Sequence, residues 1–123
     1  MIAEDITSDV IGAAIDVHRV LGPGLLESAY EACLAYELVR RGRRVERQKS
    51  LPIQYGDVSL EGGYRIDMLV DDVVVVELKS VAQLLPVHDA QLLSYLRLSG
   101  KRVGLLINFN VSVLKTGLRR LMQ

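Results

Sequence analysis

Hydrophobic positions in the first third of the chain recur at helical spacing. Between residues 6 and 21 they form one apolar stripe, made of Ile6, Val10, Ala13, Ala14, Val17, Val20 and Leu21. This period predicts an amphipathic helix from about Ile6 to Leu21. The helix should end at Gly22-Pro23-Gly24, because proline has no backbone donor. A second helix is predicted from about Leu26 to Arg41, with Gly42 as its terminator.

The pattern then changes to stretches that are typical of β-strands. One strand is predicted within Val45–Tyr55, bent near Pro52, and another over Tyr64–Val70. The dipeptide Asp71-Asp72 is short enough to be a hairpin turn. It leads into Val73–Leu78, an apolar β-branched run that indicates a strand buried on both faces.

A third helix and a further strand are expected in the last third. The helix should run from about Val87 to Leu98 and end at Gly100, and the strand should cover Val103–Phe109. The tail, Val111–Gln123, is ambiguous between a short strand and a helix. The resulting order α-α-β-β-β-α-β predicts an α/β fold with a mixed β-sheet flanked by helices.

Composition limits the class of protein. The chain has 123 residues, of which 50% are hydrophobic and 24% charged, and this fits one domain with a packed core. No segment reaches the ~18 uncharged apolar residues of a membrane span, and the acidic first residues do not resemble a secretion signal. Cys33 is the only cysteine, which excludes an internal disulfide and a cysteine-rich zinc site. We therefore expect a cytoplasmic protein with no membrane partner.

The charge is balanced overall but uneven along the chain. The net charge is zero, whereas DNA-binding proteins usually carry a basic excess. Residues 40–49 nevertheless contain six basic residues and one acid, and a second basic set comprises Arg97, Lys101, Arg102, Lys115, Arg119 and Arg120. Local patches of this kind either hold phosphates or form a solvated helix end and loop, and the sequence leaves both interpretations open.

The candidate chemistry lies at the end of the predicted buried strand. An acid at Glu77 is energetically unfavourable there unless it is paired or binds a metal. Lys79 projects from the same strand face, and Leu78 from the other. Asp67 sits in the preceding apolar strand, and a two-residue turn would bring it within one residue of direct pairing with Glu77.

Two carboxylates and an ammonium group at one end of a sheet have a clear chemical use. Hard oxygen ligands suit Mg²⁺ or Mn²⁺, which polarise a phosphodiester and lower the pKa of a bound water. A nearby lysine can orient that water or stabilise the developing phosphorane charge. The alternative is a buried Asp–Lys or Glu–Lys ion pair without catalysis. The spacing D-x9-E-x-K alone does not decide between them.

Four motifs resemble those of a known nuclease superfamily. Asp67 followed by Glu77-Leu78-Lys79 resembles the PD-(D/E)XK signature, with Ile66-Asp67 in place of its Pro-Asp element. The segment Gly24-Leu25-Leu26-Glu27-Ser28-Ala29-Tyr30 is similar to the motif that names the GxxExxY proteins, a branch of that superfamily. The segment Gln91-Leu92-Leu93-Ser94-Tyr95 resembles the Q-x3-Y motif of RecB-like nucleases, and Gly104–Phe109 is also similar to that family.

The resemblance, which spans about Ile6 to Arg120, implies a role for each matching residue. Asp67, Glu77 and the backbone carbonyl of Leu78 would bind the metal, and Lys79 would position the attacking water or the scissile phosphate. Glu27 would add an acid at the metal site. Gln91 and Tyr95 would hold the site or contact nucleic acid. The implied fold is a restriction-endonuclease-like core in which residues 1–123 form a single nuclease-like domain.

Helical spacing supports some of these assignments and leaves alternatives for others. Glu27 and Tyr30 share a helix face, although the helix dipole also favours an acid at that position. His88, Gln91 and Tyr95 share one face of the third helix, which indicates either a wet cleft or ordinary solvent-exposed residues. His88 is a candidate phosphate contact, whereas His18, near the end of the first helix, is interpreted as structural.

The main functional hypothesis is a Mg²⁺- or Mn²⁺-dependent nuclease, a hydrolase acting on the phosphodiester bonds of DNA, with RNA as a further substrate. The alternative is a non-catalytic nucleic-acid-binding or protein-interaction module that retains the nuclease fold. A purely structural ion-pair cluster would leave Glu27 and Gln91 unexplained. A homodimer is compatible with this size, because small nuclease domains often need a partner to engage both strands.

Overall fold

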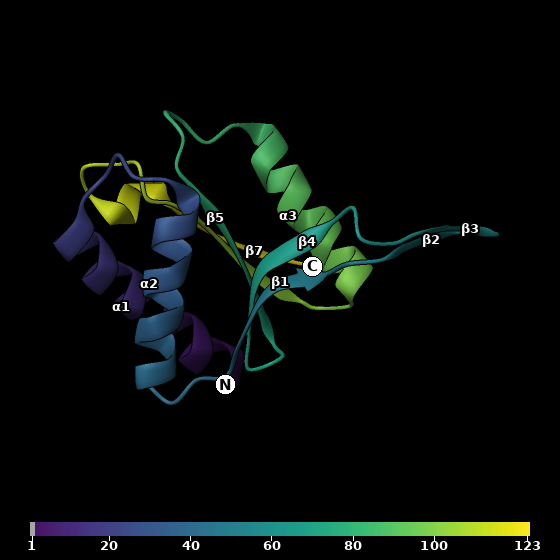
Figure 1. Ribbon diagram of the computed structural model, residues 1–123, viewed down its shortest axis with the longest axis horizontal. Coiled ribbons are helices and arrows are strands. Elements are labelled where there is room, and N and C mark those ends of the chain that lie inside the picture. Colours follow the sequence, from purple (N-terminus) through teal and green to yellow (C-terminus); the bar gives the residue numbers. More distant parts are fainter. Residues whose placement is uncertain (1) are drawn as a thin grey trace.

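Three helices cover the two faces of a central sheet in the computed structural model, which describes residues 2–123 (Figure 1). Helices α1 (Ile2–Leu21) and α2 (Glu27–Arg40) pack on one face, and α3 (Pro86–Ser99) packs on the other. Helix α1 begins four residues before the predicted start, with Glu4 and Asp5 in its first turn, where the helix dipole favours acids. Among the helices of residues 2–123, none is both long and apolar enough to cross a membrane.

The central sheet has five strands in the order β1-β4-β5-β6-β7. Their bounds are Val45–Ser50 (β1), Arg65–Val70 (β4), Val74–Lys79 (β5), Val103–Asn108 (β6) and Leu118–Met122 (β7). Strands β5 and β6 are parallel and the other neighbouring pairs are antiparallel. The α/β class and the mixed sheet are therefore confirmed. The ambiguous tail forms both a 3₁₀ turn, η1 (Leu114–Gly117), and the edge strand β7.

The segment predicted as one bent strand, Val45–Tyr55, is two strands in separate sheets. Strand β1 ends at Ser50, and β2 (Ile53–Tyr55) pairs with β3 (Val58–Leu60), a strand that the sequence pattern did not predict. Pro52 lies between β1 and β2, where it cannot donate a ladder hydrogen bond. The β2–β3 hairpin forms an arm that extends away from the sheet (Figure 1).

The hairpin turn between β4 and β5 contains one more residue than predicted. Asp71 and Asp72 have φ angles of 52° and 58°, and the Val73 amide donates to the Val70 carbonyl at 3.0 Å. The strand register, however, pairs Val70 with Val74, so Val73 is a third residue of the turn. The prediction of a direct two-residue connection is thus wrong by one residue. Continued along the hairpin, the observed register sets Asp67 opposite Glu77.

Strand alternation divides the core into two clusters, one on each face of the sheet. Val76 and Leu78 pack in the cluster with α1 and α2, whereas Val75 packs in the cluster with α3. By alternation, Glu77 and Lys79 belong to the α3 side of β5. This agrees with the prediction that Leu78 points away from its two neighbours. All residues of β5 except Lys79 are buried, so Glu77 lies in the most enclosed strand of the hairpin.

Candidate functional site

Asp67 and Glu77 meet where the backbone ladder between β4 and β5 ends. Regular pairing extends from Val70–Val74 to Met68–Val76. In the next row the Asp67 amide donates to Glu77 Oε2 at 2.9 Å. The Leu78 amide in turn donates to Asp67 Oδ2 at 2.8 Å. Each carboxylate therefore takes the place of a backbone carbonyl from the opposite strand, and the two acids are held together.

Burial makes this acid pair hard to ionise. Glu77 is only 3% exposed, and its burial, together with the charge of Asp67, raises the pKa of Glu77 to about 8. Burial also raises the pKa of Asp67, which the hydrogen bonds from Leu78 and Gln48 partly oppose. A proton or a cation between the two carboxylates would relieve the electrostatic repulsion that contributes to the raised pKa of Glu77.

Lys79 lies beside the pair without forming an ion pair. Its positive charge lowers the pKa of both Asp67 and Glu77. Within residues 2–123, however, no salt bridge joins Lys79 or any other cation to either acid. The geometry therefore disfavours the alternative of a buried Asp–Lys or Glu–Lys ion pair, and the half-buried Lys79 ammonium remains available to a ligand.

Glu27 approaches the same end of β5 from the first turn of α2. Its Oε2 accepts a hydrogen bond from the Ser80 amide at 3.2 Å, and Ser80 Oγ donates to the Leu25 carbonyl at 2.6 Å. The charge of Glu27 raises the pKa of Glu77, so the two carboxylates interact electrostatically. Across residues 2–123, no three His, Cys, Asp or Glu side chains gather into a metal-binding group. Glu27 therefore lies beside the acid pair and not within a three-acid cluster.

Tyr30 supports the loop that leads to Glu27. The side chain is fully buried, and its ring stacks on Phe109 with 4.4 Å between centroids. Its hydroxyl donates to the Gly22 carbonyl at 2.6 Å and accepts from the Leu25 amide at 3.1 Å. This location fits site support, and the burial of Tyr30 leaves no surface for a nucleic-acid contact.

Of the three polar residues predicted on helix α3, Tyr95 interacts electrostatically with the acid pair, and Gln91 bonds Tyr95. Gln91 Nε2 donates to the Tyr95 hydroxyl at 3.1 Å. Tyr95 is 7% exposed; burial raises its pKa, and the charges of Glu77 and Asp67 contribute to the shift. His88 instead accepts a hydrogen bond from the Leu85 amide through Nδ1 at 2.9 Å, which caps the start of α3.

Two polar residues near Asp67 were not identified from the sequence. Glu31 is 8% exposed and accepts hydrogen bonds from Arg47 Nε at 3.0 Å and Gln48 Nε2 at 2.6 Å. Gln48 Nε2 also donates to Asp67 Oδ1 at 3.2 Å. In the sequence, an acid at Glu31 is explained by the helix dipole alone, since it lies early in the second helix. Its spacing of four residues from Glu27 was the available signal, because it puts both acids on one face of α2.

Asn108 is a further buried polar residue at this end of the sheet. It pairs with Lys79 in the parallel β5–β6 register and is 2% exposed. Its Oδ1 accepts from the Val81 amide at 3.1 Å, and its Nδ2 donates to the Val81 carbonyl at 3.0 Å. Asn108 therefore fixes the segment that follows Lys79. A polar residue at the end of an otherwise apolar strand was the signal for it.

The basic run of residues 40–49 is largely paired within the protein. Arg43 bridges Asp9 and Asp71 at 2.8 and 2.9 Å, and Arg41 contacts Asp9 and Asp16. These ion pairs join α1 to the end of α2 and to the β4–β5 turn. They support the interpretation of this run as a structural surface, in preference to a free phosphate-binding patch.

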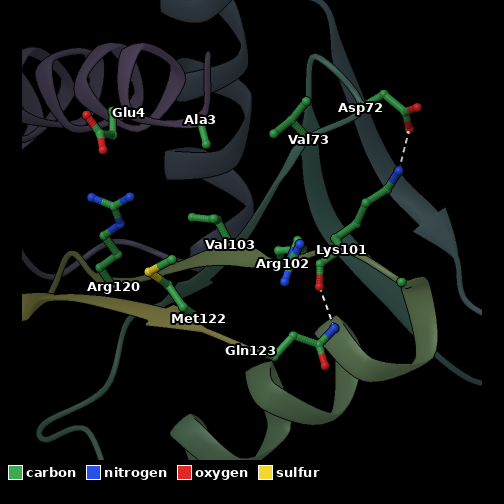
Figure 2. Close-up of a pocket in the computed structure, with 11 residues that line it drawn as sticks. Ala3, Glu4, Asp72, Val73, Lys101, Arg102, Val103, Arg120, Met122 and Gln123 are labelled. Carbon is green, nitrogen blue, oxygen red and sulfur yellow. Dashed lines mark hydrogen bonds and ion pairs between the residues drawn. The ribbon is translucent and has the colours of Figure 1, made fainter. Parts of the chain in front are cut away.

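Part of the second basic set lies far from the acid pair. Lys101, Arg102 and Arg120 line a cavity of about 510 Å³ near the start of β5 and β6, the opposite end of these strands from Glu77 (Figure 2). At the edge of this cavity Lys101 Nζ forms an ion pair with Asp72 Oδ1 at 3.2 Å. The cavity is thus separate from the candidate site.

The oxygen atoms at the acid pair fit a magnesium or manganese ion. Asp67 and Glu77 supply two carboxylates, and the Leu78 carbonyl lies next to Glu77 in the chain. A carboxylate oxygen that accepts one hydrogen bond keeps a second lone pair. Mg²⁺ usually binds through one or two carboxylates, with water and substrate phosphate completing its shell. The chemistry of this donor set therefore matches such an ion.

The chain matches the model of a known protein family. A family model described as the PD-(D/E)XK nuclease superfamily matches residues 4–121, which include every side chain of the candidate site. No curated protein and no solved structure matches the chain.

Proposed function

Because the chain belongs to the PD-(D/E)XK nuclease superfamily, we propose that it is a metal-dependent nuclease that hydrolyses phosphodiester bonds of DNA. We further propose that it belongs to the GxxExxY branch, on the motif from Gly24 to Tyr30. The proposed reacting centre consists of Asp67, Glu77 and Lys79. The proposed substrate is DNA, with RNA as a further one, and a homodimer would let two such centres act on the two strands of a duplex.

The observation that carries this proposal is the opposed pair of acids. Asp67 and Glu77 are held together by two backbone-to-carboxylate hydrogen bonds, and neither forms a salt bridge with any residue of the described range 2–123. Two enclosed carboxylates without a cationic partner are energetically unfavourable in a protein that uses them only for packing. A divalent cation bound by these two carboxylates would neutralise their charge and explain why they lie together.

Each residue of the site has a proposed task in the hydrolysis. Asp67, Glu77 and the Leu78 carbonyl would hold Mg²⁺ or Mn²⁺, which when bound would lower the pKa of water and withdraw charge from the phosphodiester. The Lys79 ammonium orients the attacking water or stabilises the extra negative charge on phosphorus. The water oxygen bonds to phosphorus and releases a proton, the P–O bond to the leaving oxygen breaks, and the leaving oxygen takes up a proton, so that one water is added across the bond overall.

Residues around the centre have supporting tasks. The Ser80 amide holds the Glu27 carboxylate beside the acid pair. From there we propose that Glu27 accepts hydrogen bonds from water molecules bound to the ion. Gln91 orients the Tyr95 hydroxyl, which lies within the field of Asp67 and Glu77 and is suited to hold the site or contact nucleic acid. His88, at the start of α3, is a proposed contact for a neighbouring phosphate.

A cleavage assay tests the proposal. Labelled single- and double-stranded DNA and RNA are incubated with the purified protein and Mg²⁺, Mn²⁺ or EDTA. We expect metal-dependent cleavage of DNA that Asp67→Asn and Glu77→Gln reduce at least ~100-fold, because each change removes a charged ligand while conserving shape. The matched control is Asp72→Asn, which changes an aspartate on the same hairpin beyond the far end of β5.

The outcomes separate the candidate functions. Equal cleavage by the wild type and both site variants would indicate a contaminating nuclease and overturn the proposal. Binding of Mn²⁺ and DNA without cleavage would favour the non-catalytic module. Absence of Mn²⁺ binding by calorimetry would show that the acid pair is not a metal site.

A further inference from the structure

We propose that Gln48 is a positioning residue for the metal-binding carboxylate of Asp67. This inference rests on the proposed function and extends it to a residue of β1 that lies outside the nuclease motifs. Its side-chain amide nitrogen donates to Asp67 Oδ1 at 3.2 Å and to Glu31 Oε1 at 2.6 Å. One neutral donor group thus links two acids that carry the same charge.

The hydrogen bonds of Asp67 show what Gln48 achieves. Asp67 Oδ2 accepts from the Leu78 amide, and Oδ1 accepts from Gln48. The carboxylate is therefore held at both oxygens, one from β5 and the other from β1. Without the Gln48 contact, rotation about the last side-chain bond of Asp67 would be restrained at one oxygen only. Groups that hydrogen-bond to a metal-binding carboxylate fix its orientation in this way.

The backbone of Gln48 indicates that this position is specialised. Its φ angle is 51°, in the left-handed region that residues with a Cβ rarely adopt. The β1–β4 register pairs Arg47 with Met68 and Lys49 with Ile66 but does not pair Gln48 with Asp67. Strand pairing is thus interrupted in the row that contains Asp67. Strained backbone of this kind persists where the surroundings enforce it, and it is frequent at functional sites.

Glu31 gives the Gln48 amide a fixed anchor. It is nearly fully buried on α2 and is also bonded by Arg47, so its carboxylate has a positive neighbour. The charge of Glu31 acts on Asp67 across the Gln48 amide. The amide therefore separates Asp67 from a second acid while it holds Asp67 in place. A carboxylate at position 48 could not perform this task, because it has no hydrogen to donate.

Two substitutions at position 48 test the inference. Gln48→Gly removes the amide and also relieves the positive φ. Gln48→Asn keeps an amide and tolerates the left-handed backbone, but it is one methylene too short to reach both acids. The matched control is Gln54→Asn, which shortens a strand glutamine that makes local hydrogen bonds in the β2–β3 arm.

Three measurements are made on each variant: Mn²⁺ binding by calorimetry, the Leu78 amide resonance by NMR, and the melting temperature. For both Gln48 variants we expect about tenfold weaker Mn²⁺ binding and a displaced Leu78 resonance. The melting temperature of Gln48→Gly should stay close to the wild-type value, since relief of backbone strain offsets the lost hydrogen bonds. Gln54→Asn should leave Mn²⁺ binding and the Leu78 resonance unchanged. This combination distinguishes positioning from a general loss of stability.

An unmoved Leu78 resonance in both Gln48 variants would overturn the inference, because Asp67 would then be held without Gln48. Wild-type Mn²⁺ affinity in both variants would overturn it as well. Failure of the wild-type protein to bind Mn²⁺ is a different result, which overturns the proposed function itself.

Discussion

The Asp67 amide donates a hydrogen bond to the Glu77 carboxylate at 2.9 Å, and the Asp67 carboxylate accepts one from the amide that follows Glu77, at 2.8 Å. The hairpin thereby presents two acidic side chains to each other across a strand pair. The same arrangement buries Glu77 beside a like charge, and this has consequences for stability that can be measured without any nucleic acid.

Stability in metal-free buffer should fall as the pH rises from about 4.5 to about 8. The pKa of Glu77 is raised from 4.5 to about 8 by burial and by Asp67. Between these values the unfolded chain has released the Glu77 proton while the folded chain retains it, so folding is disfavoured as the pH increases. The loss is on the order of 4 kcal/mol, and urea unfolding at pH 5 and pH 8 measures it.

Glu77→Gln should remove most of this pH dependence, whereas Glu61→Gln, a change at an exposed acid of the arm, should preserve it. Mg²⁺ should also stabilise the wild type more at pH 8 than at pH 5, since the ion competes with the proton. A pH dependence that Glu77→Gln leaves intact would contradict the raised pKa.

Lys79→Met should separate activity from stability. Lys79 forms no salt bridge within residues 2–123, so its removal should change the free energy of unfolding by less than about 0.5 kcal/mol. Cleavage should decrease about 100-fold, because the ammonium no longer acts on the phosphate or the water. Kinetic assays and urea unfolding give the two quantities. Lys101→Met, which removes a lysine bonded to Asp72 at the far end of the sheet, should leave cleavage unchanged.

Tyr30→Phe should destabilise the fold by about 1–3 kcal/mol, because it deprives the Gly22 carbonyl and the Leu25 amide of their buried partner. Cleavage should also fall, since this loop leads directly to Glu27. Tyr36→Phe is the matched control, because Tyr36 is 62% exposed and its hydroxyl has no such role. Equal stability of the two variants in urea would show that the Tyr30 hydroxyl does not fix the loop.

Gly117→Ala should cost about 2 kcal/mol of stability. A Cβ at this position would overlap the carbonyl oxygen of Asn108, which is backbone and cannot rotate away. The displaced Asn108 also fixes Val81 after Lys79, so cleavage should decrease as well. Gly63→Ala is the control, because no atom lies within 4 Å of the added methyl. Similar unfolding midpoints for the two variants would exclude the overlap.

Hydrophobic periodicity predicted the main elements because their burial is regular. The alternation that sets Leu78 against Glu77 and Lys79 is visible in the sequence and is confirmed by the core clusters. Two helix ends were marked by Gly22-Pro23-Gly24 and by Gly100, whose φ of 72° ends α3. The superfamily was also recognisable, because its acids and lysine keep a fixed order along the chain.

The sequence could not predict features that depend on contacts between distant segments. The exposed, very short strands of the β2–β3 arm have no buried face, so they leave no clear hydrophobic pattern. In the sequence, Glu31 cannot be distinguished from an ordinary acid near the start of a helix. Its burial results from the approach of β1. The residues around Gln48 do not indicate a positive φ, since glutamine has no preference for the left-handed region of backbone conformation.

The extra residue Val73 in the β4–β5 turn has an effect at the other end of the hairpin. Because side chains alternate between the two faces of a strand, a shift of one residue moves every side chain of β5 to the opposite face of the sheet. A chain without Val73 would align β5 one step differently against β4, and Glu77 would then face the layer of α1 and α2, away from Asp67 and Tyr95. The number of residues in a surface turn thus determines which face of the sheet carries the acidic centre.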